Sequence, residues 1–81
     1  MSHDTIHIGR LIKSKLEDNR RSVKWLAERI KCNRANVYDI FKRTSIDTDL
    51  LLNICLALKY DFFLHLSEFF KNLDHALHNH S

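Results

Sequence analysis

The chain has 81 residues, 44% of them hydrophobic, with a formal net charge of +3, one Gly and no Pro. This length predicts one small domain, and the scarcity of Gly and Pro favours helices joined by short turns over a sheet-rich fold. No apolar run reaches the ~18 residues of a membrane span, and the amino-terminal segment lacks the apolar stretch of a signal peptide, so we expect a cytoplasmic location.

Charge is unevenly distributed along the chain. Residues 1–45 contain eleven Lys and Arg against five Asp and Glu, a net +6, whereas residues 46–81 contain two against five, a net −3. A basic half favours a polyanionic partner, and the acidic half favours a different one. The alternative is that charged helices only keep the protein dissolved, and charge alone does not decide between these readings.

The first predicted helix runs from about Ile6 to Asp18, after a frayed terminus at residues 1–5. Its apolar residues recur three and four positions apart, so they share one face. They are Ile8, Leu11, Ile12 and Leu16. We expect the domain core to span about residues 6–73, with residues 74–81 as a flexible tail.

The next two predicted helices span about Val23–Lys31 and Arg34–Lys42. Ser22 and Asn33 precede them, and both residue types cap helix N-termini with a side-chain oxygen. The connection between the helices is too short for a loop that folds back, so the helices must cross steeply. The pattern predicts a helix-turn-helix, whose second helix enters the major groove in DNA-binding proteins.

The last two predicted helices are the most apolar. Asp47 is a good N-cap for the fourth, whose core stripe is Leu51, Ile54, Cys55 and Leu58, widened by Leu50, Leu52 and Leu56. Asp61 would cap the fifth, which begins near Phe62 and ends at Ala76 or Leu77. Its apolar residues form two stripes, one of Phe62, Leu66, Phe69 and Leu73 and a second of Phe63, Phe70 and Leu77. The first is expected to bury against the first helix and Trp25, and the second either fills the core or forms an interface.

The segment from Ser22 to Arg43 resembles the helix-turn-helix of the Xre/Cro family of phage-type repressors, and the likeness extends from about residue 8 to residue 70. The family's apolar slots are occupied here by Leu26, Ala27, Ile30, Cys32, Val37 and Ile40. The resemblance implies an all-α, compact five-helix, lambda-repressor-like DNA-binding domain. Two positions depart from the pattern. Lys31 replaces a turn Gly that is typically left-handed, and Trp25 occupies a slot that is normally polar.

Residues near the start of the third helix are the candidate base readers. By resemblance, Arg34, Ala35 and Asp39 hold the family's usual base-reading positions. Arg34 has a planar fork suited to guanine, Asn36 can pair with adenine, and Ala35 can touch a thymine methyl. Tyr38 also points outward. Asp39 would meet phosphate repulsion, so we expect it to orient a neighbouring Arg.

Phosphate contacts are expected from basic and polar residues around the third helix. The candidates are Lys24, Asn33, Lys42, Arg43 and Thr44. Val23 takes a slot where the family often has a polar backbone contact. One helix-turn-helix reads few base pairs, so useful affinity implies a homodimer on half-sites ~34 Å apart. The candidate dimer surface is Phe63, Phe70 and Leu77.

Cysteines and histidines predict no active centre. Cys32 and Cys55 fall on apolar faces and are expected to be reduced. His75, His78 and His80 cluster near the end of the chain, but zinc needs three or four ligands on an ordered frame, so no metal is predicted. There is no nucleophile set or Gly-rich phosphate loop, so the chain is predicted to be a non-enzyme without a cofactor.

Two alternatives remain for the function. The chain is either a DNA-binding regulator, most simply a repressor, or a protein-interaction module such as the antitoxin of a toxin–antitoxin pair. In the second case its acidic, aromatic half would bind a basic toxin, and DNA binding would be autoregulatory or absent. A phage-derived decoy that binds another regulator is a third possibility.

Overall fold

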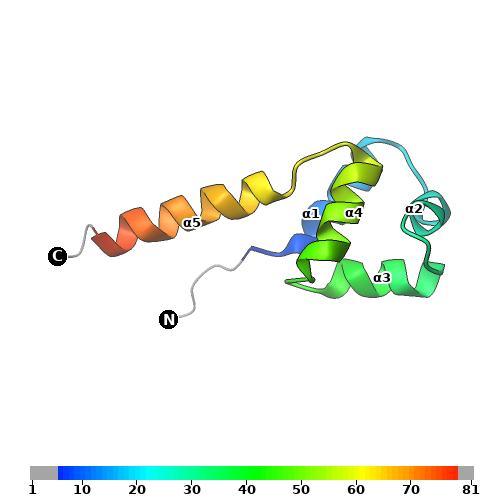
Figure 1. Cartoon of the computed structure of the whole chain (residues 1–81), viewed down its shortest axis with the longest axis horizontal. Helices are drawn as coiled ribbons and strands as arrows, with labels where there is room; N and C mark the ends of the chain where they lie inside the picture. The colour runs from blue at the N-terminus through cyan, green and yellow to red at the C-terminus, as the bar shows by residue number, and fades with distance from the viewer. Residues whose placement is uncertain (1–5, 79–81) are drawn as a thin grey trace.

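The computed structural model describes residues 6–78, and α-helices are the only regular secondary structure in that range. The five helices are α1 (Ile8–Asp18), α2 (Val23–Arg29), α3 (Arg34–Lys42), α4 (Thr48–Leu58) and α5 (Phe63–His78). Helices α1 to α4 form a packed body, and α5 leads away from it, as Figure 1 shows. The molecule therefore measures 49 × 24 × 23 Å. The predicted all-α, five-helix class, with the second and third helices packed together, is confirmed.

Three predicted N-caps are present with the expected geometry. The side-chain oxygens of Ser22, Asn33 and Asp47 accept hydrogen bonds from the backbone N–H three residues later, at 3.0, 2.9 and 2.7 Å. A further cap, at His7, was not predicted. His7 Nδ1 accepts the N–H of Arg10 at 3.1 Å, and α1 therefore begins at Ile8 and not at Ile6. Each cap satisfies a backbone donor that has no partner within its helix.

The turn between α2 and α3 depends on one left-handed residue. Lys31 has φ 59°, as the resemblance implied for this position. The N–H of Cys32 then bonds the carbonyl oxygen of Ala27 at 2.9 Å, which closes the end of α2. Because Ile30 already leaves helical geometry, α2 ends at Arg29, two residues earlier than expected. A left-handed conformation costs a residue with a Cβ about 1 kcal/mol relative to Gly.

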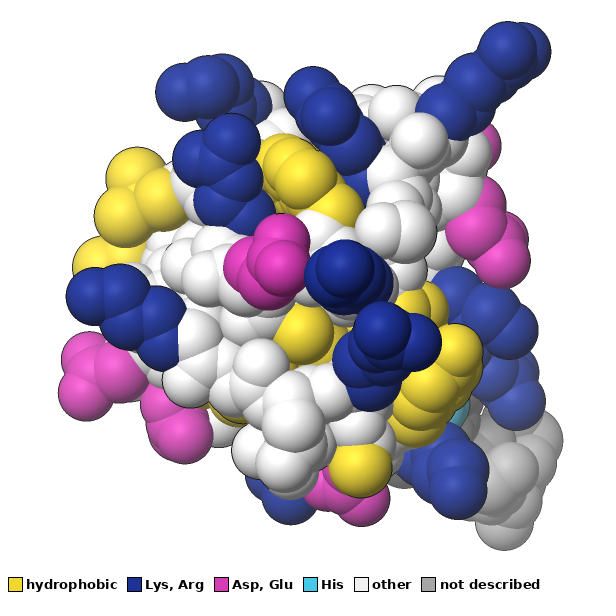
Figure 2. All heavy atoms as spheres, turned by 90° about the vertical axis from the view of Figure 1, so that its right-hand side faces the viewer, with side chains coloured by type: hydrophobic (Ala, Val, Ile, Leu, Met, Phe, Trp, Pro, Cys, Tyr) yellow, Lys and Arg dark blue, Asp and Glu magenta, His cyan; other side chains and the backbone are white. Residues whose placement is uncertain are grey.

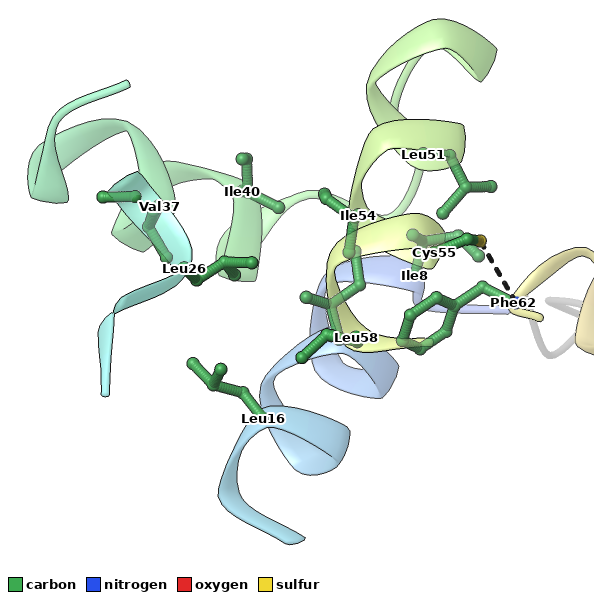
Figure 3. Close-up of a cluster of buried hydrophobic side chains, with 12 residues drawn as sticks. Ile8, Leu16, Leu26, Val37, Ile40, Leu51, Ile54, Cys55, Leu58 and Phe62 are labelled. Atoms are coloured by element: carbon green, nitrogen blue, oxygen red, sulfur yellow. Dashed lines mark hydrogen bonds between the residues drawn. The ribbon is translucent and has the colours of Figure 1, made fainter. Parts of the chain in front are cut away.

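One hydrophobic core joins the first four helices and the residue before α5 (Figure 3). Its fully buried side chains include Ile12, Leu26, Val37, Leu51, Ile54 and Phe62. The predicted inner stripe of α4 is buried, but the predicted widening is wrong for two of its three residues. Leu52 and Leu56 are 49% and 66% exposed. They lie on the outer face of α4, where no other helix covers them.

The start of α5 is fixed to the body, and the remainder of the helix is not. The N–H of Phe62 donates to Cys55 Sγ at 3.4 Å, and the Tyr60 hydroxyl lies 2.6 Å from His65 Nε2. Of the predicted inner stripe only Phe62 is fully buried, whereas Leu66, Phe69 and Leu73 are partly exposed. The expected burial of that stripe is therefore confirmed for Phe62 and in part for Leu66. It is wrong for Phe69 and Leu73 and for the contact with Trp25, because α5 points away from α2 (Figure 1).

The predicted tail also needs correction. Residues 74–78 continue α5 to His78, so the chain is helical where a flexible tail was expected. Residues 79–81 and the expected frayed terminus at residues 1–5 lie outside the described residues. The helix ends slightly beyond the predicted Ala76 or Leu77, because its apolar residues keep helical spacing to its end and no Gly or Pro interrupts it.

Candidate nucleic-acid interface

The outer face of α3 carries all five predicted base-reading residues. Arg34, Ala35, Asn36, Tyr38 and Asp39 are exposed, while Val37 and Ile40, on the opposite face, are buried in the core. This split follows from the helical period, because positions 37 and 40 lie one turn apart. Residues 34–36, which form the first turn of α3, are all exposed, so side chains of α2 and α4 leave this turn uncovered.

Asn33 has a more limited role than the sequence alone indicates. Its Oδ1 accepts the N–H of Asn36 at 2.9 Å, so this oxygen is engaged in capping α3. The Asn33 side-chain amide retains two N–H donors, and these are the atoms that would meet a phosphate oxygen. The cap and a phosphate contact are therefore compatible.

Asp39 holds Arg43 on the surface of α3. Its Oδ2 accepts from Arg43 Nε at 2.9 Å and forms an ion pair with a terminal guanidinium nitrogen at 2.7 Å. The two side chains are 55% and 53% exposed, so the pair contributes little to stability. Its effect is positional. The Asp39 charge is neutralised, and three of the five guanidinium N–H groups of Arg43 remain for another acceptor.

The phosphate candidates lie at the ends of the helix-turn-helix. Lys24 is in the first turn of α2, and Lys42, Arg43 and Thr44 are at the end of α3 and just after it; all four are exposed. Backbone hydrogen bonds fix this second group. The carbonyl oxygens of Arg43 and Thr44 accept from Gly9 and Ile8 at 2.9 and 3.0 Å. The segment leaving α3 is thus held against the first turn of α1.

The end of the body where α2 lies and α3 begins is rich in basic side chains. Figure 2 shows Lys and Arg spread over this face, with fewer Asp and Glu among them. A shallow hollow of about 280 Å³ lies between α3 and the start of α4 and is lined partly by Asn36, Asp39 and Arg43. The surface is convex and charged, which suits contact with a groove of a polyanion more than enclosure of a small molecule.

Sequence reasoning did not foresee the surroundings of Trp25. The guanidinium carbons of Arg21 and Arg29 lie 4.7 and 5.1 Å from its ring centroid, which is cation–π distance. The signal was the spacing, because Arg21, Trp25 and Arg29 are four residues apart and share one side of the α2 segment.

The expected dimer residues are exposed to different degrees. Phe63 is half-buried at the start of α5, and Phe70 and Leu77 are 65% and 68% exposed. Together with Leu66 and Leu73 they are alternately three and four positions apart, the pattern of a coiled-coil seam. Phe63 and Leu66 pack partly against the core of the body, and the rest of this face has no partner helix in the described part of the chain.

Within the described residues, the cysteines and histidines do not form a metal centre. Both thiols are free, Cys55 is buried and Cys32 is half-buried. Burial raises the pKa of the Cys32 thiol, so it stays protonated and a weak nucleophile near neutral pH. Within residues 6–78 no three His, Cys, Asp or Glu side chains converge as metal ligands. His80 and the His78 side chain lie outside the described residues.

Two further findings complete the description. No helix in residues 6–78 combines the length and apolar character needed to cross a bilayer. No protein-family model matches this chain, and neither does the sequence of any curated protein.

Proposed function

We propose that this protein is a sequence-specific, double-stranded-DNA-binding transcriptional regulator of Xre/Cro type, acting most simply as a cytoplasmic repressor. The observation that carries the proposal is the exposed first turn of α3 on a packed helix-turn-helix. In this motif the N-terminal part of the second helix contacts base edges in the major groove. The proposal involves no catalytic step and no cofactor.

Base reading is assigned to residues whose chemistry matches base edges. Arg34 would donate two hydrogen bonds to guanine O6 and N7, and Asn36 would pair with adenine N6 and N7. Ala35 would pack on a thymine methyl, with Tyr38 further along the same face. Asp39 would act through Arg43, because their ion pair sets the direction of the guanidinium.

Phosphate contacts would position α3 without reading sequence. Lys24 would hold one side of the motif, and Lys42, Arg43 and Thr44 the other. Asn33 would add its amide donors at the start of α3. The hydrogen bonds from the first turn of α1 to the Arg43 and Thr44 carbonyls support this role, because they fix the backbone that carries these side chains.

A homodimer completes the proposal. The seam of Phe63, Phe70 and Leu77 on α5 would pack against the same seam of a second copy, burying side chains that are otherwise exposed. A two-fold dimer would place two α3 helices on half-sites ~34 Å apart.

The decisive experiment is selection of bound sequences from a pool of random duplexes. We expect a two-fold symmetric consensus with a fixed half-site spacing, because a symmetric dimer imposes its symmetry on its operator. Retention of random sequence without enrichment would contradict specific readout.

A variant pair separates base reading from positioning. Arg34→Ala should cost about 1–3 kcal/mol on the selected operator and much less on random duplex, whereas Lys42→Ala should weaken both alike and lower the salt slope by about one for each protomer. Lys71→Ala on α5 removes the same charge far from α3 and is the matched control. Equal losses for Arg34→Ala on both duplexes would argue against base contacts.

The exposed apolar face of α5 also favours the second candidate, a protein-interaction module such as an antitoxin. In that case the chain would be recovered in a stoichiometric complex with a basic toxin, and the complex would depend on Phe70 and Leu77. Nanomolar operator binding with a steep salt dependence would exclude a decoy that binds only another regulator.

A further inference from the structure

A groove with a basic rim runs between α2 and the last turns of α4. It consists of two adjoining hollows of about 370 and 400 Å³ that share Arg29, Leu56 and Ala57 as lining residues. Its apolar lining side chains include Trp25 and Leu56, which lie among basic and neutral polar side chains. Leu56, near the end of α4, is 66% exposed, so the groove presents apolar surface to solvent.

Four cations line this groove and no acid does. Arg21, Arg29 and Lys59 surround the first hollow, and Lys31 joins Arg29 at the second. Within the described part of the chain, none of these four cations forms an ion pair with a carboxylate. The ion pair found there joins Arg43 and Asp39. Two guanidinium groups lie over Trp25 instead, at 4.7 and 5.1 Å. Stacking of this kind leaves the N–H edges of an Arg available to a planar anion such as a carboxylate.

Backbone geometry adds an independent observation. Lys31 and Lys59 are both left-handed, with φ 59° and 54°, at helix ends where Gly is the usual residue. Each costs about 1 kcal/mol relative to Gly. The groove thus has a Lys at two positions where the backbone alone would favour a residue without a side chain.

None of the residues that line the groove is among the predicted DNA-contacting residues. α4 begins beside α3 and ends on the far side of the body, and Leu56, Ala57 and Lys59 come from that far end (Figure 1). A duplex lying along the outer face of α3 would therefore leave the groove open. α5 leads away from α2 and does not cover it.

We propose that this groove is a docking site for an acidic, amphipathic segment of a partner protein. Leucine or aromatic side chains of the segment would cover Trp25 and Leu56, and its carboxylates would meet Arg21, Arg29 and Lys59. Charge complementarity selects this occupant, because a groove lined by four cations and no acid, with Trp25 and Leu56 among them, matches a segment that alternates apolar and acidic residues. The site would serve to recruit a partner or to control the protein. This proposal does not depend on DNA binding by α3.

Trp25 supplies the readout, because it is the only tryptophan of the chain. The probe is the synthetic peptide acetyl-Glu-Glu-Leu-Phe-Glu-Glu-Leu-Leu-amide, titrated into the full chain while Trp25 emission is followed. We expect a saturable change in emission. A peptide with Gln for every Glu, and one with Ala for every Leu and Phe, should each bind at least about tenfold more weakly.

Variants locate the binding site, with a labelled form of the same peptide followed by anisotropy. Arg29→Gln and Leu56→Ser should each weaken binding about tenfold. Both positions are exposed, so the far-UV circular dichroism should remain that of the wild type. Lys13→Gln removes an equal charge from the exposed face of α1, outside the groove, and should leave peptide affinity within about twofold.

Three results would overturn the proposal. The first is equal binding of the acidic and the Gln peptides, or no change in Trp25 emission with either. The second is a random-sequence duplex that displaces the peptide and loses as much affinity from Arg29→Gln as from Lys42→Ala, which would assign the groove to nucleic acid. The third is a change of oligomeric state in Arg29→Gln or Leu56→Ser during sedimentation, which would assign it to a second copy.

Discussion

Gly9 is the residue at which α1 approaches the end of α3 most closely. Its N–H donates to the Arg43 carbonyl oxygen at 2.9 Å. An added Cβ would lie 2.5 Å from the carbonyl oxygen of Phe41 and 2.7 Å from that of Arg43, and closer still to that of Ile40. These are backbone atoms, so no side chain can move aside. The only Gly of the chain is thus required where the proposed phosphate-contacting segment is attached to α1.

We therefore expect Gly9→Ala to destabilise the protein by about 1–3 kcal/mol or more, although Ala has the better helix propensity. Urea unfolding followed by circular dichroism measures this. Ser14→Ala, at an exposed position of the same helix, is the control and should change stability by less than about 0.5 kcal/mol. Similar stabilities for the two variants would mean that α1 and α3 can separate freely.

At Lys31 we expect a substitution to raise the stability of the protein, in contrast to Gly9. Lys31→Gly should stabilise the fold by up to about 1 kcal/mol, because it removes the strain of a left-handed residue with a Cβ. Lys24→Gly, in the first turn of α2, removes the same charge at a helical position and should destabilise instead. Thermal denaturation at matched salt compares them. Destabilisation by both would show that the Lys31 side chain contributes more than its backbone conformation costs.

At the scale of the helix, α5 differs from the four helices of the body. Its connection to α4 is anchored by Phe62, whose ring is fully buried and lies 4.8 Å from that of Tyr60. Lys15 of α1 covers the other partner of this pair, at 4.1 Å from the Tyr60 ring centroid. Beyond this anchor, α5 makes little contact with the four helices of the body.

Two phenylalanines eight residues apart should therefore respond differently to truncation. Phe62→Ala should cost about 3–5 kcal/mol at any protein concentration, because it opens a cavity in the core. Phe70→Ala should leave the stability of the body nearly unchanged and weaken self-association. Urea unfolding and analytical ultracentrifugation, each at two protein concentrations, separate the effects. A monomeric wild type with an unaltered Phe70→Ala would remove α5 as the dimer surface.

At the scale of the whole molecule, charge and shape divide the chain in the same way. The basic residues 1–45 contain the first three helices, and the acidic residues 46–81 contain α4 and the projecting α5. A duplex held by α3 would thus meet the basic half and be kept from the acidic one. The same division leaves α5 available for a second copy, at a distance from the DNA.

Salt dependence tests this arrangement. Three phosphate-contacting cations in each protomer of a dimer predict a slope of about −5 for log affinity against log salt concentration. Phe70→Glu, which should prevent the α5 seam from forming, is expected to halve that slope and to weaken operator binding. Fluorescence anisotropy over a series of salt concentrations measures both. An unchanged slope in a variant shown to be monomeric would mean that one protomer makes all the phosphate contacts.

The sequence by itself determined the local features of this protein. Caps at Ser22, Asn33 and Asp47 and the apolar period of the first four helices depend on residues three or four positions apart. Their positions along the chain therefore fix the outward face of α3. The left-handed Lys31 followed from the resemblance, since the turn has the same length.

Only the tertiary structure decided what depends on the path of the chain. Apolar stripes in α4 and α5 look alike in sequence, but Phe62 is buried whereas Leu56 and Phe70 are exposed, because burial requires a neighbouring element and α5 turns away from the body. The groove beside Trp25 was likewise decided by the tertiary structure. Its cations come from the ends of separate helices, and packing alone brings them together around Trp25 and Leu56.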